Sequence, residues 1–510
     1  MTGLDLNAVR DIVRSISMGS RVAEDERQAL SAYFVETENW RKVFEGEVDV
    51  VFAPKGGGKS AIYSMLMSRE SALFDRGILL TTAENPSGQT AFAEVEKAPP
   101  TSEDEFVGLW KTYFLALIAQ TFNSYDINSP KANELIALLE GAELVKPDGT
   151  PKKQILHFVM DYVKSWFRPA ESVEAELRMD PLTGIPIVKP KITFTEPTTA
   201  ERSNGFVAID DLLLKADEAL EAETLDVWIL LDRLDVAFAS EPELEANALR
   251  ALFRVYRDIQ ALDHLKLKIF LRSDIWDAIT RQGFREASHI TRDLRITWSE
   301  SALMQLVVQR LLQSNALAQH YSVDRDQVLA SAQAQKALFY SVYPAQIDQG
   351  SKKPATFDWC LTRTKDGTGT NAPRELIHLL SETKNEQLSR FEIGQATPEG
   401  HAIFDRQAFK DALPQVSEVR LKQTLYAEHP ALRSYLELLE GQKTRHNHAS
   451  LARLWSVSEE QAQAVSEDLV RIGFFEARGE DYWVPFMYRH ALSLVQGSAE
   501  EVGTVSSDDD

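Results

Sequence analysis

The stretch Val48-Asp49-Val50-Val51-Phe52-Ala53-Pro54-Lys55-Gly56-Gly57-Gly58-Lys59-Ser60-Ala61-Ile62 decides the fold of this chain. Its β-branched and apolar beginning predicts a strand, three glycines interrupt the pattern, and a helix is expected from about Lys59. The spacing is small-x-x-x-x-Gly-Lys-Ser, with Ala53 where this pattern usually has glycine. A strand, a glycine-rich turn and a helix in this order predict a phosphate-binding loop. The alternative is a glycine-rich turn with only a structural role.

Each part of the stretch suits a bound nucleotide. Glycines lack a Cβ, so their backbone can take positive φ and turn N–H groups toward a phosphate. The start of the helix adds unsatisfied amides and the positive end of its dipole. Lys59 would reach the β- and γ-phosphates of ATP, and the Ser60 hydroxyl would bind Mg²⁺. The predicted nucleotide contacts are Pro54, Lys55, Gly56, Gly57, Gly58, Lys59, Ser60 and Ala61.

Composition limits the classes of function. The 510 residues suffice for roughly three domains. No run approaches the roughly 20 apolar residues of a membrane span and no signal peptide is visible, so we expect a cytoplasmic protein without membrane contact. A single cysteine, Cys360, excludes an intrachain disulfide and a cysteine-based metal cluster. The net charge of −22 opposes binding of nucleic acid through a general field, though not through a local basic patch.

Helical and strand patterns surround the phosphate loop. The first 45 residues have a helical pattern, and we expect residues 30–35 to pack on the nucleotide-binding domain. A second strand, residues 77–82, ends in a polar turn that contains Glu84. The pattern of residues 103–121 predicts an amphipathic helix whose core stripe is Phe106, Leu109, Trp110, Tyr113, Phe114, Leu117 and Ile118.

The part between residues 124 and 204 has a looser pattern. We expect an insertion there, with a β-hairpin formed by residues 173–177 and 192–195.

A further apolar strand, residues 227–231, ends in Asp232-Arg233-Leu234-Asp235. This pattern fits a central parallel strand that is buried on both faces and opens at its carboxyl end onto a ligand crevice. Asp232 is then the Walker B aspartate, predicted to orient Mg²⁺ beside Ser60. A strand that ends in a capping aspartate is the alternative, and the phosphate loop argues against it.

With these motifs the chain resembles P-loop ATPases of the AAA+ and STAND classes, including bacterial initiator-like members that end in a winged helix. The resemblance extends over most of residues 46–495 and implies an α/β fold. It predicts a P-loop NTPase core with a central parallel sheet, in which a further strand separates the Walker B strand from the P-loop strand. The expected parts are an N-terminal helical segment 1–45, an ATPase core 46–298, a helical lid 299–429, a winged helix 430–497 and an acidic disordered tail 498–510.

The resemblance also suggests which residue activates the attacking water. AAA+ members usually have glutamate directly after the Walker B aspartate, whereas this sequence has Arg233. Asp235 matches an Asp-x-x-Asp variant of STAND-like relatives and is the predicted catalytic base. Glu84 is the alternative, because some relatives keep this glutamate on a neighbouring strand.

Further roles follow from positions in the family. Arg272 or Ser273, after the strand at residues 267–271, would be sensor 1, with a salt bridge at the strand end as the alternative. Arg374 opens an apolar helix after Pro373 and would be sensor 2, with a solvent-facing arginine as the alternative. An arginine acting on a neighbouring subunit would come from the segment before the last strand, residues 294–298; the candidates are Arg281, Arg285, Arg292 and Arg295.

The winged helix is expected from three helices, residues 431–439, 450–455 and 458–472, and a wing formed by residues 474–477 and 482–486. The third helix carries Glu459, Glu460, Glu467 and Asp468 against Arg471, which opposes insertion into a DNA groove and favours a protein-facing role. A basic cluster supports the opposite interpretation; its members are Lys443, Arg445, His446 and His448.

These features predict a molecular switch that binds and hydrolyses ATP with Mg²⁺. Movement of its lid and winged helix would control a protein partner or an assembly, which can include further copies of the chain. The resemblance adds bacterial anti-phage defence as a setting. The alternatives are a DNA-engaged AAA+-like motor or loader and a nucleotide-binding scaffold with little hydrolysis; the missing Walker B glutamate favours the scaffold.

Overall fold

The computed structural model describes residues 5–20, 30–83, 102–146, 155–156, 159–163, 191–203, 205–234, 242–281 and 283–499. The chain forms two compact units. The first unit contains Met1–Thr37, Lys55–Gly58 and Thr297–Asp510, and the second contains Glu38–Pro54 and Lys59–Ile296. The finer domain boundaries expected from the sequence stay predictions.

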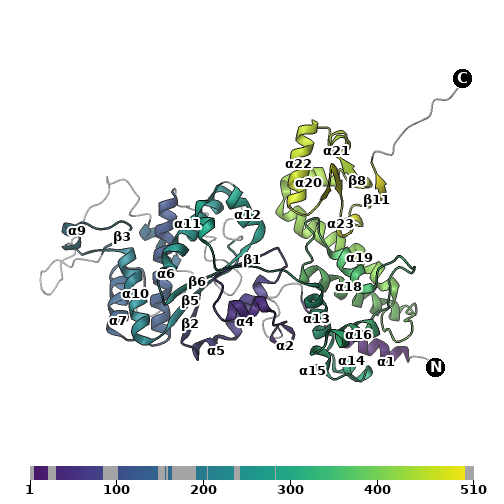
Figure 1. Ribbon diagram of the computed structural model, residues 1–510, viewed down its shortest axis with the longest axis horizontal. Helices are drawn as coiled ribbons and strands as arrows, with labels where there is room; N and C mark the ends of the chain where they lie inside the picture. Colours follow the sequence, from purple (N-terminus) through teal and green to yellow (C-terminus); the bar gives the residue numbers. More distant parts are fainter. Residues whose placement is uncertain are drawn as a thin grey trace. The chain divides into compact units, whose positions relative to one another are not determined.

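The second unit is built on a five-stranded sheet whose strands are all parallel (Figure 1). The strand order is β2-β5-β6-β1-β7, with β2 Ile78–Thr82, β5 Asp226–Leu231, β6 Leu265–Arg272, β1 Val50–Ala53 and β7 Asp293–Arg295. Strand β6 lies between β1 and β5, which confirms the predicted strand between the phosphate-loop strand and the Asp232 strand. Because carboxyl ends of parallel strands share one edge, the chain leaves β1, β5 and β6 at the same edge.

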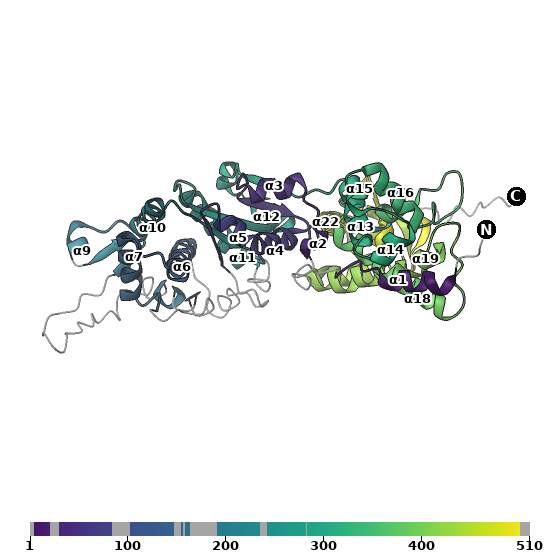
Figure 2. The same ribbon diagram turned by 90° about the horizontal axis from the view of Figure 1, so that it is seen from below.

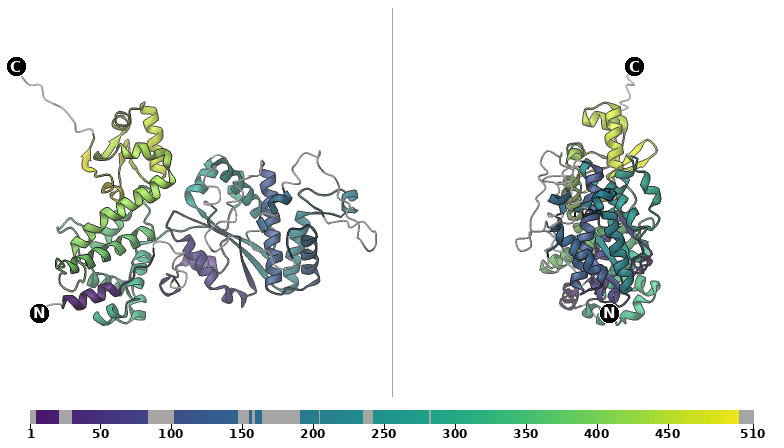
Figure 3. Two further views of the ribbon diagram at one scale, coloured as in Figure 1. Left: turned by 180° about the vertical axis from the view of Figure 1, so that it is seen from behind. Right: turned by 90° about the vertical axis from the view of Figure 1, so that its left-hand side faces the viewer.

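Helices cover this sheet because its central strands are apolar on both faces, and every residue of β1 and β2 is buried. Figure 3 shows the long blue helix α6 next to the strands, with further helices around it. Among the described residues of this unit the helices are α3 Glu38–Phe44, α4 Lys59–Ser68, α5 Glu70–Phe74, α6 Glu103–Ser124, α7 Pro130–Gly141, α9 Thr199–Ser203, α10 Ile209–Glu223, α11 Pro242–Ile259 and α12 Ser273–Arg281, with a 3₁₀ turn at Arg285–His289.

Helix α6 differs from the amphipathic helix that the sequence predicts. All seven residues of its expected stripe are buried, but so are residues on its other sides, because α6 packs against β2, α7, α10 and α11. Even Lys111 is buried, and its ammonium lies 2.7 Å from a carboxylate oxygen of both Asp210 and Asp258. A helix surrounded on most sides by protein has no solvent-facing stripe.

The insertion is only partly described. Strand β3, Lys191–Thr193, pairs in parallel with β4, Phe206–Ala208. The other arm of the expected hairpin, residues 173–177, lies outside the described residues. The strand predicted at residues 192–195 therefore exists in shortened form, and its described partner is parallel.

The first unit begins with α1, Leu6–Ser15, which packs against α18 and α14 (Figure 2). Residues 30–35 were expected to pack on the nucleotide-binding domain; this segment, with α2 Leu30–Tyr33, belongs to the first unit and packs on α13. The Arg310 guanidinium of α13 lies 4.3 Å from the ring centroid of Tyr33, and Gln309 donates a hydrogen bond to the Phe34 carbonyl. A short apolar segment predicts that it packs on an apolar surface, but its sequence does not specify which surface.

The region after residue 299 is predominantly helical, as predicted, and several of its helices begin at a serine or aspartate whose side chain accepts a backbone N–H. Its helices are α13 Glu300–Leu311, α14 Asn315–His320, α15 Arg325–Leu329, α16 Ala332–Val342, α17 Thr356–Thr364, α18 Pro373–Glu392 and α19 Arg406–Val419, continued by a π-helical segment Arg420–Tyr426 and a 3₁₀ turn Pro430–Leu432.

The C-terminal residues form a four-stranded sheet, in the order β11-β8-β10-β9, with helices packed on it. The elements are α20 Arg433–Glu437, β8 Lys443–Asn447, α21 His448–Trp455, α22 Glu459–Arg471, β9 Glu476–Arg478, β10 Asp481–Trp483, α23 Phe486–Arg489 and β11 Val495–Ser498. The three predicted helices and two wing strands are present. Strands β8 and β11 and helix α23 were not predicted from the sequence.

A buried ionic cluster holds β1 between its two neighbours. The carboxylate of Asp49, directly before β1, is 2.8 Å from the Lys268 ammonium of β6 and 2.7 Å from the Arg292 Nε before β7. Tyr256 of α11 donates a third hydrogen bond to it, at 3.2 Å. Burial lowers the pKa of Lys268, although the Asp49 charge opposes this shift. Lys268 also donates to the Val48 carbonyl and stacks over Trp228.

Removal of the Asp49 carboxylate would leave a buried ammonium without its counter-ion. We expect Asp49→Ala to lower the free energy of unfolding of the second unit by about 3–5 kcal/mol. Urea unfolding followed by hydrogen exchange of the β1 and β6 amides measures this loss. The matched control is Asp75→Ala at an exposed position, for which a change within about 0.5 kcal/mol is expected. A loss below about 1 kcal/mol for Asp49→Ala would show that the cluster does not hold the sheet.

Candidate functional site

The phosphate loop has the backbone that its glycines were predicted to provide. Gly56 has φ of +76° and Gly58 has φ of +101°, both in the left-handed region that glycine tolerates. A Cβ at Gly56 would lie 2.8 Å from the Cβ of Arg374, so glycine is also required for space. Helix α4 begins at Lys59, directly after the loop.

Residues of the first unit surround Lys55–Gly58. Arg374, at the second position of α18, lies against Gly56. The indole N–H of Trp298 donates a 2.9 Å hydrogen bond to the Gly57 carbonyl, and Lys55 forms an ion pair with Glu428. The predicted sensor 2 arginine is therefore brought to the phosphate loop. Trp298 and Glu428 were missed, because nothing near them in the sequence marks a contact with a loop some 240 residues or more away.

The two predicted magnesium ligands meet at the carboxyl edge of the sheet. Ser60, in the first turn of α4, donates a hydrogen bond of 3.3 Å to Oδ2 of Asp232, which follows β5 and is 4% exposed. A hydroxyl and a carboxylate are hard oxygen donors of the type that Mg²⁺ takes, with phosphate oxygens and water in its remaining positions. The residues therefore fit the metal that the sequence predicts.

The end of β6 supplies an arginine that is already paired. Arg272 holds Asp274 with two hydrogen bonds, Nε to Oδ1 at 3.1 Å and a terminal nitrogen to Oδ2 at 2.7 Å. Desolvation raises the pKa of Asp274, but the hydrogen bond and charge of Arg272, with the nearby Lys59 ammonium, hold it below its usual value. Ser273 starts α12. This pair is the salt bridge at the strand end that the sequence offered as the alternative to a sensor 1 role for Arg272.

The residues proposed to activate water lie outside the described part of the chain. This applies to Asp235 and to Glu84. Arg233, which stands where AAA+ members have glutamate, is described and has φ of +58°. A left-handed backbone at a non-glycine residue is costly, and such positions cluster at functional sites. The structure thus places an unusual backbone directly after Asp232.

Three of the four candidate arginines in and before β7 have partners within the second unit. Arg292 belongs to the Asp49 cluster, Arg295 pairs with Asp277 at 3.2 Å, and Arg281 donates to the Asp277 carbonyl. Arg285 begins the 3₁₀ turn. The Asp49 cluster accounts for Arg292 without a role in a neighbouring subunit.

The predicted basic cluster near β8 is not a uniformly basic surface. His446 is buried, and burial lowers its pKa although its hydrogen bond with the Lys443 carbonyl opposes this. His448 bonds the Tyr482 hydroxyl at 2.5 Å, and Arg445 pairs with Asp481 at 2.7 Å. The acidic residues of α22 are exposed or half-exposed, as expected.

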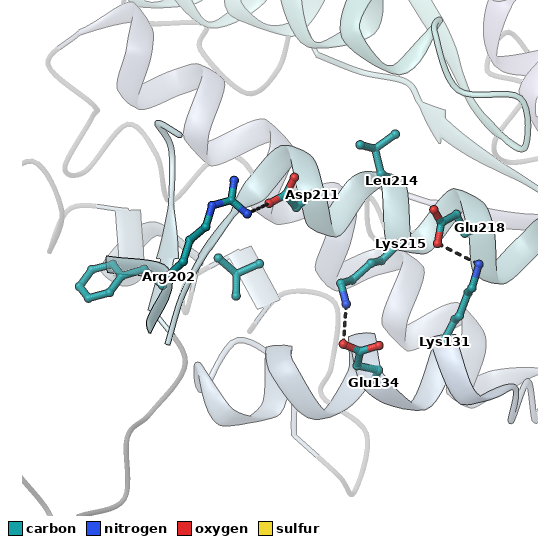
Figure 4. Close-up of a pocket in the computed structure, with 9 residues that line it drawn as sticks. Lys131, Glu134, Arg202, Asp211, Leu214, Lys215 and Glu218 are labelled. Atoms are coloured by element: carbon teal, nitrogen blue, oxygen red, sulfur yellow. Dashed lines mark hydrogen bonds and ion pairs between the residues drawn. The ribbon is translucent and has the colours of Figure 1, made fainter. Parts of the chain in front are cut away.

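A hollow of about 490 Å³ lies between α7, β4 and α10 (Figure 4). Its cations Lys131, Lys215 and Arg202 each pair with a carboxylate, of Glu218, Glu134 and Asp211 respectively. None of the predicted site residues lines it.

The described residues offer neither a cluster of metal ligands nor a membrane-spanning helix. They contain no group of three or more histidine, cysteine, aspartate or glutamate side chains that could hold a metal ion. Within the same residues, every helix is too short or too polar to cross a membrane.

Comparisons with known proteins assign no family. No family model matches the chain, and no curated protein matches it. Among solved structures, it is similar to the Aeropyrum pernix ORC2 protein, whose structure is described as ADPNP-ADP complexes. The identity is 13%, the match covers 94% of this chain and 96% of the other, and the TM-score is 0.31. A similarity at this level supports no argument about fold or function.

Lys59 tests the loop directly. We expect Lys59→Ala to weaken binding of a fluorescent ATP analogue at least about tenfold, because backbone amides cannot replace a point charge on the phosphates. The control is Lys422→Ala, whose exposed side chain pairs with Glu418. Unchanged affinity together with unchanged ATP turnover in the Lys59 variant would refute the assignment of this loop.

Proposed function

We propose that this chain binds ATP with Mg²⁺ at the phosphate loop, hydrolyses it, and acts as a nucleotide-dependent switch on a protein partner. The observation that carries the proposal is the 3.3 Å contact between Ser60 and Asp232. These residues are 172 positions apart and follow strands β1 and β5, which are separated by β6. A purely structural glycine turn would not need this pair of oxygen donors beside Lys59.

Binding rests on complementary charges. The glycine loop offers backbone N–H groups, α4 adds its positive end, and Lys59 adds a full charge. Mg²⁺, when bound, would neutralise charge on the β- and γ-phosphates, with Ser60 and Asp232 holding it. Arg272, or Ser273 beside it, would then fill the sensor 1 position. Because its guanidinium is held by Asp274, Arg272 is oriented before any nucleotide binds.

Signal transfer would run through the first unit. Arg374 lies on the loop, and the turn just before α18 reaches the C-terminal module: the Gly367 N–H donates to the Gly473 carbonyl at 2.7 Å. We assign residues 299–429 as a lid and residues 430–497 as a winged helix, which the order of helices and strands supports. Loss of the γ-phosphate could then alter the position of the C-terminal module through α18 and this turn.

A DNA-engaged motor is the second candidate, and the order α20-β8-α21-α22-β9-β10 is the observation in its favour. The charge of α22 argues against it. Four carboxylates and one guanidinium on the helix that would enter a groove add repulsion to phosphates. A scaffold that binds nucleotide with little hydrolysis is the third, and a setting in anti-phage defence stays a prediction from the resemblance.

The two aspartates after β5 should separate by role. Asp232→Asn should weaken Mg²⁺-dependent ATP binding, whereas Asp235→Asn should leave binding within about twofold and slow turnover about a hundredfold, because a base acts on the water and not on the ground-state complex. Nucleotide titrations and phosphate release measure the two effects. Normal turnover of the Asp235 variant would move the base to Glu84 or another group. Turnover that is negligible in the wild type would favour the scaffold.

Binding of duplex DNA distinguishes the proposed switch from the DNA-engaged motor. We expect no submicromolar binding of duplex by the full chain at about 0.15 M salt, and no stimulation of ATP turnover by DNA. Anisotropy titrations of labelled duplex check the first expectation. Submicromolar binding that disappears in a Lys443→Glu and Arg445→Glu double variant would replace the switch by the motor.

A further inference from the structure

Two arginines stack on one exposed aromatic ring in the C-terminal half of the chain, and two further cations act on the same group of charges. Phe486, at the start of α23, is 41% exposed. Arg489 of α23 stacks over its ring at 3.9 Å and Arg363 of α17 at 4.5 Å. Arg478 of β9 and Lys365, just after α17, lie close enough for their charges to act on neighbouring groups of the same site. We call these four cations and Phe486 the arginine cluster.

The guanidinium groups of the cluster are held in place by protein contacts. Arg489 donates to the Val484 carbonyl at 2.8 Å and to the Gln496 side chain at 2.9 Å. Arg363 also stacks over Trp359 at 4.6 Å and is 15% exposed. Such a planar group, fixed before a ligand arrives, loses little freedom when it binds a carboxylate through two N–H donors.

Carboxylates on the protein balance only part of this charge. Glu476 is engaged by Arg478 in a two-point contact of 2.9 Å. Asp348 is 3.7 Å from Arg363 but is shared with Lys410 at 3.1 Å. Glu476 and Asp348 thus balance only part of the charge of the four cations, and Asp348 also serves Lys410. Burial lowers the pKa of Arg489, and the charges of Arg363 and Arg478 lower it further, although the Glu476 charge opposes them. An added anion would relieve this repulsion.

We propose that the arginine cluster is a docking site for an acidic segment of a protein partner, with carboxylates bound by Arg478, Arg489 and Lys365 and an apolar side chain against Phe486. The inference rests on the proposed role of this module in engaging a partner, and it names the chemistry of that partner. Protein domains that recognise acidic motifs commonly do so with clusters of arginine.

The surroundings favour a short acidic peptide over nucleic acid. Glu476, Glu480 and Asp481 of the β9-β10 hairpin flank the cluster in the sequence, and α22 of the same module is acidic. A duplex presents a negative charge about every 1.7 Å along its axis, so a long polyanion would meet these carboxylates and the net charge of −22. A peptide segment needs only the cluster itself. The exposed ring adds an apolar contact that a phosphate backbone does not offer.

The site is connected to the phosphate loop within the first unit. Arg363 lies in the last turn of α17 and Lys365 follows this helix. Residues 366–371 form a turn closed by the pairing of Lys365 with Asn371, and α18 then carries Arg374. Arg374 lies against Gly56 of the loop. A partner bound at the cluster would therefore act on the segment that leads into the predicted sensor 2 residue.

The test uses the full chain and a fluorescein-labelled peptide of aspartate and glutamate with one leucine. We expect saturable binding in anisotropy titrations at about 0.15 M salt that weakens as salt is raised. A double variant, Arg478→Gln with Arg489→Gln, should weaken it at least about tenfold. Lys365→Glu, at an exposed position, should also weaken binding, and it keeps the test valid if the double variant fails to fold. Phe486→Ser should weaken binding with every charge retained.

Matched controls define the result that would overturn the site. Arg471→Gln in α22 removes one exposed arginine of the same module and should leave affinity within about twofold. An equal loss in the Arg471 and cluster variants, no binding by the wild type, or equal binding of a peptide with asparagine and glutamine in place of the acids would overturn the proposal. Labelled duplex DNA that binds more tightly than the peptide, and loses affinity in the cluster variants, would replace it by a nucleic acid site.

The same titrations separate the docking site from the proposed switch. Peptide affinity measured with and without MgATP, in the wild type and in Lys59→Ala, reports the coupling. If the cluster variants lose the peptide while nucleotide has no effect, the docking site stands and the switch fails. If ATP is bound and hydrolysed but the wild type does not bind the peptide, the docking site fails and the ATPase stands.

Discussion

The carboxylate of Asp49 is the interaction on which the rest of the second unit depends. It stands directly before β1 and is bound by Lys268 from β6 and Arg292 from the segment before β7, so both neighbours of β1 are tied to it at one end. Charge is costly to bury, and a buried ion pair seldom adds net stability. The effect of the Asp49 cluster is to fix the position of β1. Because the amino end of β1 is held, the residues that follow its carboxyl end lie beside those that follow β5 and β6.

Much of this arrangement could be predicted from the sequence because it is local. The strand, the three glycines and the helix from Lys59 carry their own signals, as does the apolar run that ends at Asp232. Parallel pairing then brings Ser60 and Asp232 together. The Asp49 cluster could not be predicted, because its partners lie 219 and 243 residues away and a single aspartate before a strand has no distinctive pattern. The same reason explains why Trp298 and Glu428 were missed.

Other differences arise from packing that the sequence pattern does not specify. Helix α6 was expected to have a solvent face, but it is surrounded by neighbouring helices and the sheet, and Lys111 reaches Asp210 and Asp258 to remain charged in that place. Strand β11 was missed because Val495–Ser498 is short and has no alternating pattern. Of the predicted basic cluster, His446 points into the core, since every second residue of a strand faces the same side.

The arginines of the chain differ in whether a carboxylate pairs with them. In a chain with a net charge of −22, most of the described arginines pair with a carboxylate, as Arg445 does with Asp481 and Arg420 with Glu375. Arg489 departs from this pattern, because its bonded partners are a carbonyl and an amide and its charged neighbours include two arginines. Because neutral groups hold this guanidinium, its positive charge can attract an external anion. Only a short segment joins the arginine cluster to Arg374. An anion bound at the cluster and a ligand bound at the phosphate loop would therefore both act on helix α18.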